Sequence, residues 1–178
     1  VIRRMRALVK KEELDFAPIN IVSVINDVVQ LVHSDGILRN IRVQIECQDG
    51  LPRVRGDRVQ LQQVVLNLLI NAFDAMKEAI ATERNVKVRA KTNGAGTVEV
   101  SVRDHGTGLT SNELARIFQP FYTTKREGLG MGLSISRSII EAHGGRLWAE
   151  NNADRGATFH FTVLAIDGAP SHGTDMDR

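Results

Sequence analysis

The 178-residue sequence has a single cysteine, Cys47, and only 4% aromatic residues. One cysteine excludes an internal disulfide and allows a reducing compartment. Because Cys47 lies in an alternating, strand-like run, we interpret it as a buried structural thiol. Aliphatic side chains must fill the core, and a hydrophobic content of 42% is enough for one globular domain.

Long apolar runs and a strong excess of one charge are also missing. No apolar run approaches the roughly 18 residues of a membrane span, and no signal peptide leads the chain, so we expect a cytoplasmic domain without membrane contact. The formal net charge is +2, and basic residues concentrate in residues 1–13, "VIRRMRALVKKEE". A nucleic-acid-binding protein would instead spread them over a folded face among aromatic residues.

Three parts are predicted along the chain. Residues 1–17 read as a short helix and a linker, which look cut from something longer because so short a helix is marginal alone. Residues 18–165 form the globular domain. Residues 166–178 lack apolar periodicity and are predicted to be a flexible tail or linker. The sequence contains no internal repeat.

Periodicity predicts an α+β two-layer sandwich: a mixed, mostly antiparallel sheet of about five strands with three main helices on one face. Asn20 is expected to cap the first helix, Thr110–Glu113 is a capping box, and residues 48–57 read as a turn-rich connection. The helices are expected at residues 21–40, about 57–80, 110–117 and 132–143, and the strands at 41–47, 85–92, 97–104, 146–152 and 157–165.

The predicted helix over residues 57–80 carries a thin polar stripe on a surface that is otherwise apolar, the reverse of a usual surface helix. Either the stripe touches solvent or it faces a polar ligand. Asparagine is usually kept at helix caps, so Asn67 and Asn71 at i and i+4 favour a ligand, and an amide oxygen suits Mg²⁺. The stripe comprises Gln60, Gln63, Asn67, Asn71, Asp74 and Glu78.

Glycines surround two further points of the chain. "VRDHGTG" ends a predicted strand at Asp104, which is either a turn former or a carboxylate that accepts a hydrogen bond from a ligand amine. "LGMGL" places Gly130 and Gly132 in front of a helix whose N-terminus is then a ready anion site. Lys125, just before this stretch, would add positive charge for a phosphate.

Other nucleotide-binding motifs do not fit this sequence. No G-x-x-x-x-G-K-[ST] motif is present, which excludes a P-loop. A dinucleotide fold requires glycine or alanine at the position of Ile135 and a parallel βαβ unit around it. Nothing matches the catalytic loop of the Ser/Thr kinases.

Four segments, in this order, resemble the motifs of the bacterial sensor histidine kinases: "QQVVLNLLINAFDAM" the N box, "DHGTG" the first glycine box, "FQPFYTTK" the F box and "GLGMGL" the second glycine box. The resemblance covers residues 20–165 and is to the catalytic ATP-binding domain, whose Bergerat fold is shared with DNA gyrase, Hsp90 and the MutL ATPase. The short lid is most similar to kinases of the nitrogen- and oxygen-sensing type.

This resemblance implies ATP and Mg²⁺ as ligands and assigns roles to individual residues. Asn71 is expected to coordinate Mg²⁺, Asn67 to support the phosphates or the metal, and Asp104 to bind the adenine amino group. Phe118 and Phe121 are expected to pack the lid against the core. The expected catalytic residues are Asn67, Asn71 and Lys125, and the expected nucleotide-binding set is Asn67, Asn71, Asp74, Asp104, Gly106, Gly108, Lys125, Gly128, Leu129, Gly130, Met131, Gly132 and Leu133.

Position 67 separates kinases from hydrolases within the resembling superfamily. The hydrolases carry a glutamate there to activate water, and Asn67 cannot act as that base. Phosphoryl transfer depends mostly on positioning and charge stabilisation, which such a site offers without a base of its own. The resemblance therefore implies transfer of the γ-phosphoryl group to an external histidine.

None of the five histidines has the setting of the acceptor, which family members carry before an acidic residue on a dimeric helical hairpin. Residues 1–13 resemble the tail of the second helix of that hairpin. We therefore interpret the chain as a fragment of a homodimeric kinase that phosphorylates its own dimerisation domain and, indirectly, a response regulator. A serine kinase of the anti-sigma type and a non-catalytic nucleotide-sensing module remain alternatives.

Overall fold

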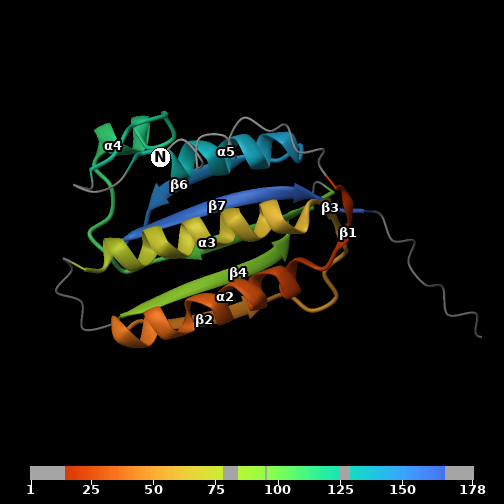
Figure 1. Cartoon of the computed structure of the whole chain (residues 1–178), viewed down its shortest axis with the longest axis horizontal. Helices are drawn as coiled ribbons and strands as arrows, with labels where there is room; N and C mark the ends of the chain where they lie inside the picture. Colours follow the sequence, from red (N-terminus) through yellow and green to blue (C-terminus); the bar gives the residue numbers. More distant parts are fainter. Residues whose placement is uncertain (1–14, 78–83, 95, 125–128, 167–178) are drawn as a thin grey trace, which may run out of the picture.

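A five-stranded mixed sheet carries three helices on one face (Figure 1). The computed structural model describes residues 15–77, 84–94, 96–124 and 129–166. Across the sheet the strands lie in the order β2 (Arg42–Cys47), β4 (Asn85–Thr92), β5 (Thr97–Arg103), β7 (Ala157–Leu164) and β6 (Leu147–Asn151). β2 and β4 run parallel, and the other three neighbouring pairs are antiparallel. The predicted fold class is confirmed.

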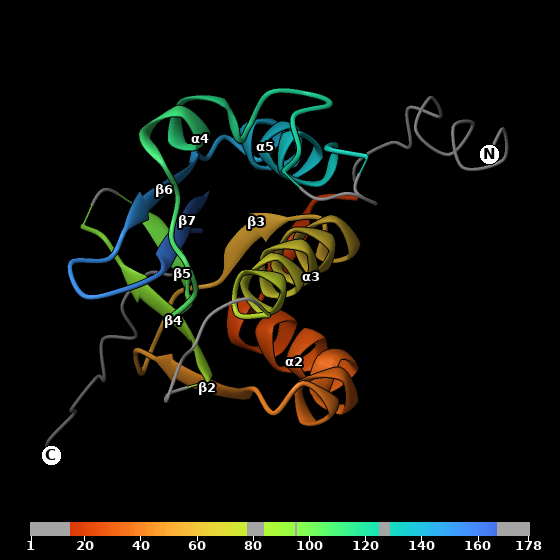
Figure 2. The same cartoon turned by 90° about the vertical axis from the view of Figure 1, so that its left-hand side faces the viewer.

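The end-on view in Figure 2 shows the helices on one side of the sheet. The three long ones are α2 (Ile21–Leu38), α3 (Arg58–Ala75) and α5 (Gly132–Ala142), and a short fourth helix, α4 (Ser111–Arg116), precedes α5 in the chain. α3 packs between α2 and α5 and is the centre of the helical layer. The alternation predicted for β4 and β5 is observed, since every second residue of β5 is buried beneath the helices: Val98, Val100 and Val102.

The helix ends follow the capping residues of the sequence. The side chain of Asn20 accepts a hydrogen bond from the N–H of Val22 at the start of α2, and Asp57 caps α3 in the same way. Both halves of the Thr110–Glu113 capping box are present. α3 ends at Ala75, earlier than the predicted Ile80; residues 78–83 lie outside the described residues.

Two short strands were not predicted. β1 (Ala17–Ile19) and β3 (Val54–Gly56) form an antiparallel pair at the start of α2 and α3. β3 lies within the connection predicted over residues 48–57, and β1 begins at the end of the linker predicted over residues 1–17. Three residues are too few to show the period of a strand, and the partners lie far apart in the sequence. The predicted helix within residues 1–17 and the tail over 166–178 fall almost entirely outside the described residues.

The expectation about membrane spans also needs correction. α2 has 18 residues and a mean hydropathy of 1.3, so it is long and apolar enough, by length and composition only, to cross a membrane. A core helix passes the same test, and α2 packs along α3 through the buried side chains Val24, Ile25, Val28 and Val32. This packing accounts for the buried apolar side chains of α2, whereas Leu31, Ile37 and Leu38 of the same helix are exposed.

Candidate nucleotide-binding site

Asp104, directly after β5, is a buried carboxylate with one oxygen held by the backbone. Its side chain is 1% exposed, and Oδ1 accepts hydrogen bonds from the N–H groups of Gly106 (2.8 Å) and Ala157 (3.2 Å). Burial raises the pKa of this carboxyl, although the two N–H donors oppose the shift. No described residue donates to Oδ2. The second oxygen is therefore available to a donor such as an adenine amine.

The end of β6 and the turn between β6 and β7 hold the Asp104 loop in place. The amide of Asn152 donates to the carbonyl oxygens of Asp104 (2.9 Å) and Arg155 (2.8 Å). Asn151 exchanges two hydrogen bonds with the backbone of Leu109. Both asparagines fall within the strand predicted over residues 146–152, and only the tertiary structure reveals this support.

The Asp104 loop abuts the C-terminal end of α3 at Gly106. A Cβ atom at Gly106 would lie 2.6 Å from the carbonyl oxygen of Ala75, so glycine permits this approach of loop to helix. Gly108 has a φ of +74°, which also favours glycine. The backbone geometry thus accounts for glycine at both positions. That these two residues shape the adenine pocket is what the resemblance implies.

The first turn of α5 contacts α3 at a second place, which lies nearer to the N-terminus of α3. A Cβ at Gly132 would lie 2.5 Å from Oδ1 of Asn67, and the Nδ2 of Asn67 donates to the Oγ of Ser136 at 3.0 Å. Met131 precedes the helix and provides no side-chain cap. The first N–H groups of α5 are thus free of a side-chain cap, as an anion site requires.

These two contacts fix the spacing of the site along α3. The Asp104 loop meets the helix at Ala75 and α5 meets it at Asn67, eight residues apart, which corresponds to about 12 Å along the axis. Asn71 lies midway between them, on the same face as Asn67 and half-buried. The places predicted to bind the adenine and the phosphates are therefore separated by a distance that an extended nucleotide can bridge.

Asp74 takes a different place from the other predicted residues. Its carboxylate forms ion pairs with Arg39 at the end of α2 (2.8 Å) and with Lys77 (3.1 Å). Hydrogen bonding to Asp74 raises the pKa of Arg39. These contacts tie α3 to α2, and a role of Asp74 toward the nucleotide stays a prediction.

The residues between α4 and α5 are only partly described. Lys125 and Gly128 lie outside the described residues. Gly130 has a φ of +64° and packs against the backbone of Phe121 and Tyr122, since a Cβ there would come within 2.7 Å of the Tyr122 oxygen. Met131 and Leu133 are half-buried, whereas Leu129 is 77% exposed.

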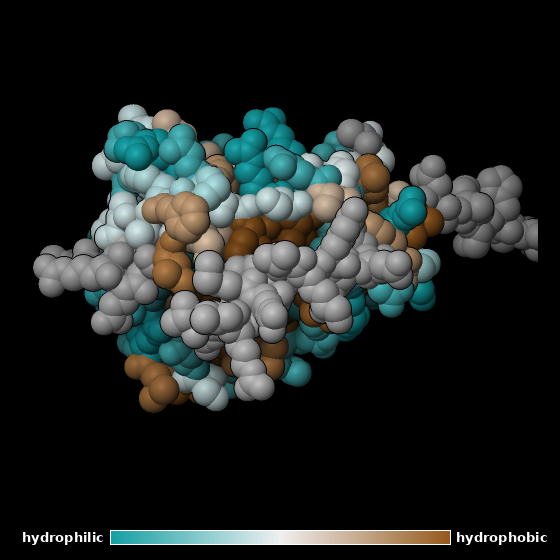
Figure 3. Space-filling model, turned by 45° about the horizontal axis from the view of Figure 1, so that its top comes forward, coloured by the Kyte–Doolittle hydropathy of each residue, from teal (hydrophilic) through white to brown (hydrophobic). Residues whose placement is uncertain are grey.

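The two phenylalanines predicted to pack the lid differ. Phe118 packs edge-on against Phe159 of the core, with ring centroids 6.4 Å apart. Phe121 is 75% exposed, so its predicted packing role was wrong for this structure. Figure 3 shows hydrophobic residues along the middle of the face that carries α4 and α5. Exposed Phe121 and Leu129 are both in the segment that joins these helices.

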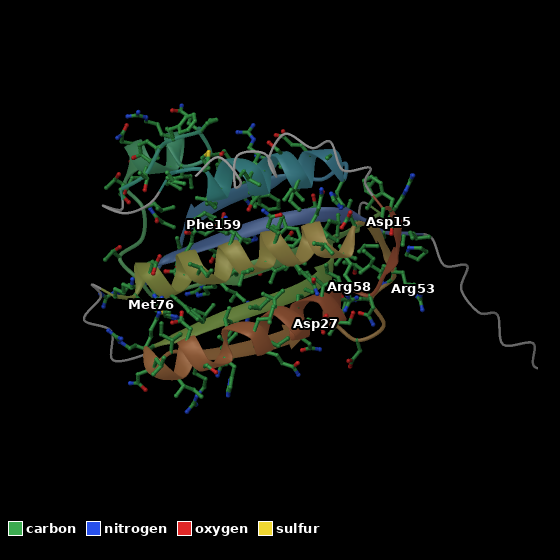
Figure 4. The ribbon with its side chains drawn as sticks, viewed as in Figure 1. Asp15, Asp27, Arg53, Arg58, Met76 and Phe159 are labelled. Atoms are coloured by element: carbon green, nitrogen blue, oxygen red, sulfur yellow. The ribbon has the colours of Figure 1, made fainter. Side chains whose placement is uncertain are left out.

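Two hollows lie away from the residues predicted to bind the nucleotide. One, of about 300 Å³, lies between α4, α5 and β6. The other, of about 660 Å³, lies where α2 and α3 begin and is lined by Asp15, Arg53 and Arg58 among others (Figure 4). Arg58 is paired there with Asp27 at 2.6 Å. Neither hollow includes Asn67, Asn71 or Asp104.

His143 caps the C-terminal end of α5 through a buried ring. Its Nδ1 lies 2.7 Å from the carbonyl oxygen of Ile139, and Nε2 accepts the N–H of Asp57 at 2.9 Å. A ring nitrogen that accepts an N–H carries no proton, so the ring donates from Nδ1. This contact ties the end of α5 to the start of α3.

Three features lie along α3: a buried carboxylate, an asparagine pair and the uncapped N-terminus of another helix. Together they are typical of a nucleotide-binding domain. A family model described as histidine kinase-, DNA gyrase B-, and HSP90-like ATPase matches residues 56–166. The chain belongs to this family. Its fold and similarities further define it as the ATP-binding catalytic domain of a two-component sensor histidine kinase.

Individual relatives agree with this assignment. The chain is 42% identical over 168 residues to the sensor protein FixL of Bradyrhizobium diazoefficiens, covering 94% of this chain and 33% of FixL. The chain thus spans about a third of the length of this curated relative. The catalytic domain of histidine kinase ThkA superposes with a TM-score of 0.72 at 33% identity, covering 85% of this chain and 96% of that domain.

Two larger similar structures are complexes, one with AMPPNP and one with a response regulator protein. Full-length ShkA in complex with AMPPNP has a TM-score of 0.79 at 29% identity, over 93% of this chain and 35% of ShkA. ThkA in complex with the response regulator protein TrrA has a TM-score of 0.76 at 30% identity, over 93% of this chain and 46% of ThkA.

Proposed function

We propose that this domain binds Mg-ATP along α3 and donates the γ-phosphoryl group to a histidine on a separate dimerisation domain of the same kinase. The observation that carries the proposal is Asp104. Its Oδ1 accepts two backbone N–H groups, whereas no described residue donates to Oδ2, and Oδ2 is not closed off from solvent. A carboxylate oxygen that is open in this way can accept a hydrogen bond from a ligand donor.

Different residues are expected to contact different parts of the nucleotide. Asp104 Oδ2 accepts the adenine amine, and Gly106 and Gly108 let the flat ring approach the backbone. Gly130 and Gly132 leave the N-terminal N–H groups of α5 open to the phosphates. Asn67 lies beside this end of α5. Lys125 and Gly128 are expected to join the phosphate end, and Leu129, Met131 and Leu133 to flank it.

The residues present fit a magnesium ion that arrives with the nucleotide. The described residues contain no cluster of three acidic, histidine or cysteine side chains that would hold a metal alone. The Oδ1 of Asn71 would instead share the ion with the phosphates, which is how Mg²⁺ commonly binds in kinases. Bound there, Mg²⁺ would neutralise phosphate charge.

Asn67 favours a protein acceptor over water, because an amide cannot serve as the general base for hydrolysis. The acceptor histidine would lie in the part of the kinase beyond this chain, which spans a third of its relatives' length. In ThkA a response regulator is bound to the kinase, and we propose that a response regulator receives the phosphoryl group here. For this function we expect the whole kinase to be a homodimer. We also expect the domain to lie in the cytoplasm, where ATP is present.

A transfer assay tests the proposal. The chain is incubated with γ-labelled Mg-ATP and the dimerisation hairpin of the same full-length protein. Label on the hairpin that is lost in acid and stable in alkali is expected. Acid-stable label on serine would indicate a serine kinase, and nucleotide binding without transfer would indicate a nucleotide-sensing module. Either result would overturn the histidine acceptor.

A further inference from the structure

Ser136 is a buried hydroxyl to which neither the sequence motifs nor the proposed function assigns a role. It lies on the second turn of α5, is 1% exposed, and accepts one hydrogen bond, from Nδ2 of Asn67 at 3.0 Å. Its side chain has no other polar partner among the described residues. A buried hydroxyl is costly without a partner, so the contact with Asn67 accounts for its presence.

The side chain of Asn67 lies between two residues of α5. Gly132 and Ser136 are four residues apart and therefore share one face of the helix. The Nδ2 of Asn67 points to Ser136, and its Oδ1 lies against Gly132, where a Cβ would be only 2.5 Å away. The amide is thus oriented, with its oxygen directed toward the first turn of α5.

We propose that Ser136 is a positioning residue that fixes the amide of Asn67, so that its oxygen faces the phosphate-binding end of α5. This inference rests on the proposed function, because it assigns Asn67 to the triphosphate end of the site. Ser136 itself touches no nucleotide. Without its hydroxyl the Asn67 amide is free to rotate, and the triphosphate loses a fixed partner.

A comparison of two ligands separates this role from a general effect on the fold. Mg-ATP uses both ends of the site, whereas AMP uses mainly the adenine end at Asp104. Ser136→Ala is expected to weaken Mg-ATP about fivefold, the scale of one hydrogen bond, and AMP less than twofold. A merely structural role would weaken both ligands alike or neither.

Ser138→Ala is the matched control, because Ser138 is on the same helix, is exposed and bonds only the carbonyl oxygen of Ser134. It should bind both ligands as the wild type does. Ser136→Thr keeps the hydroxyl and should restore the preference for Mg-ATP. Equal loss of both ligands in Ser136→Ala, or an unchanged Mg-ATP affinity, would overturn the proposal.

A measurement on the ligand-free protein tests the positioning role of Ser136 independently of the proposed function. The side-chain amide of Asn67 should give two well-separated proton resonances by NMR in the wild type and in Ser138→Ala. In Ser136→Ala the resonance of the bonded proton should shift upfield. An unshifted resonance would contradict the positioning role, whereas a wild type that binds no nucleotide would contradict the proposed function and leave the NMR result standing.

Discussion

Asp104, the residue proposed to bind adenine, lowers the stability of the fold that carries it. Its carboxylate is buried without a counter-charge in contact, and burial raises its pKa. A raised folded-state pKa means that the folded protein holds the proton more tightly than the unfolded chain. The stability that this proton contributes is complete below the ordinary value of 3.8 and is lost as the pH rises through the folded-state pKa.

Asp104→Asn should therefore stabilise the nucleotide-free domain at neutral pH while weakening ATP binding at least tenfold, since the charge-assisted acceptor is lost. The asparagine oxygen still accepts the N–H groups of Gly106 and Ala157. Thermal unfolding at several pH values checks this: the variant's advantage should be present at pH 7 and vanish below about pH 4. A variant less stable than wild type at pH 7 would contradict the sign.

Both ring nitrogens of His143 form hydrogen bonds that stabilise the fold. His143→Ala would leave the N–H of Asp57 without its partner, remove the side-chain donor at the carbonyl oxygen of Ile139, which keeps its backbone hydrogen bond, and open a cavity beside Phe16, whose ring lies 4.9 Å away. We expect a loss of about 2–4 kcal/mol in the free energy of unfolding. Urea denaturation measures it, and a loss below about 0.5 kcal/mol would show that these bonds are dispensable.

Among the elements, the junction between α3 and the Asp104 loop depends on one glycine. Gly106→Ala places a methyl group against the backbone of Ala75, which cannot move aside as a side chain would. The expected cost is about 1–3 kcal/mol, with weaker ATP binding because the loop must withdraw. The exposed neighbour Thr107→Ala is the control. Equal stability of the two variants by calorimetry would refute the close packing.

The same elements show what the sequence could and could not predict. α2, α3, β4 and β5 were predictable because each is long enough to show its period and carries its own caps or turns. β1 and β3 were not, because a three-residue strand has no period of its own. The support that Asn152 gives to Asp104 was also invisible, since it joins residues 48 positions apart through the pairing of β5 with β7.

For the whole molecule, the candidate site needs two elements, α5 and the Asp104 loop, brought to one helix, α3. Asn67 and Asn71 were predictable from the stripe on α3, and Asp104 from the glycines around it. Their placement relative to one another was not, because it follows from the packing of α5 and the Asp104 loop against Asn67 and Ala75.

Binding of Mg-ATP by this chain and by its Asp104→Ala variant tests the central claim most directly. Titration calorimetry on the wild type should show one site, and the variant should show no measurable binding at the same concentrations. Asp154→Ala, which removes an exposed aspartate paired with Arg103, should bind as the wild type does. If Asp104→Ala binds Mg-ATP with wild-type affinity, the nucleotide does not lie along α3 as proposed.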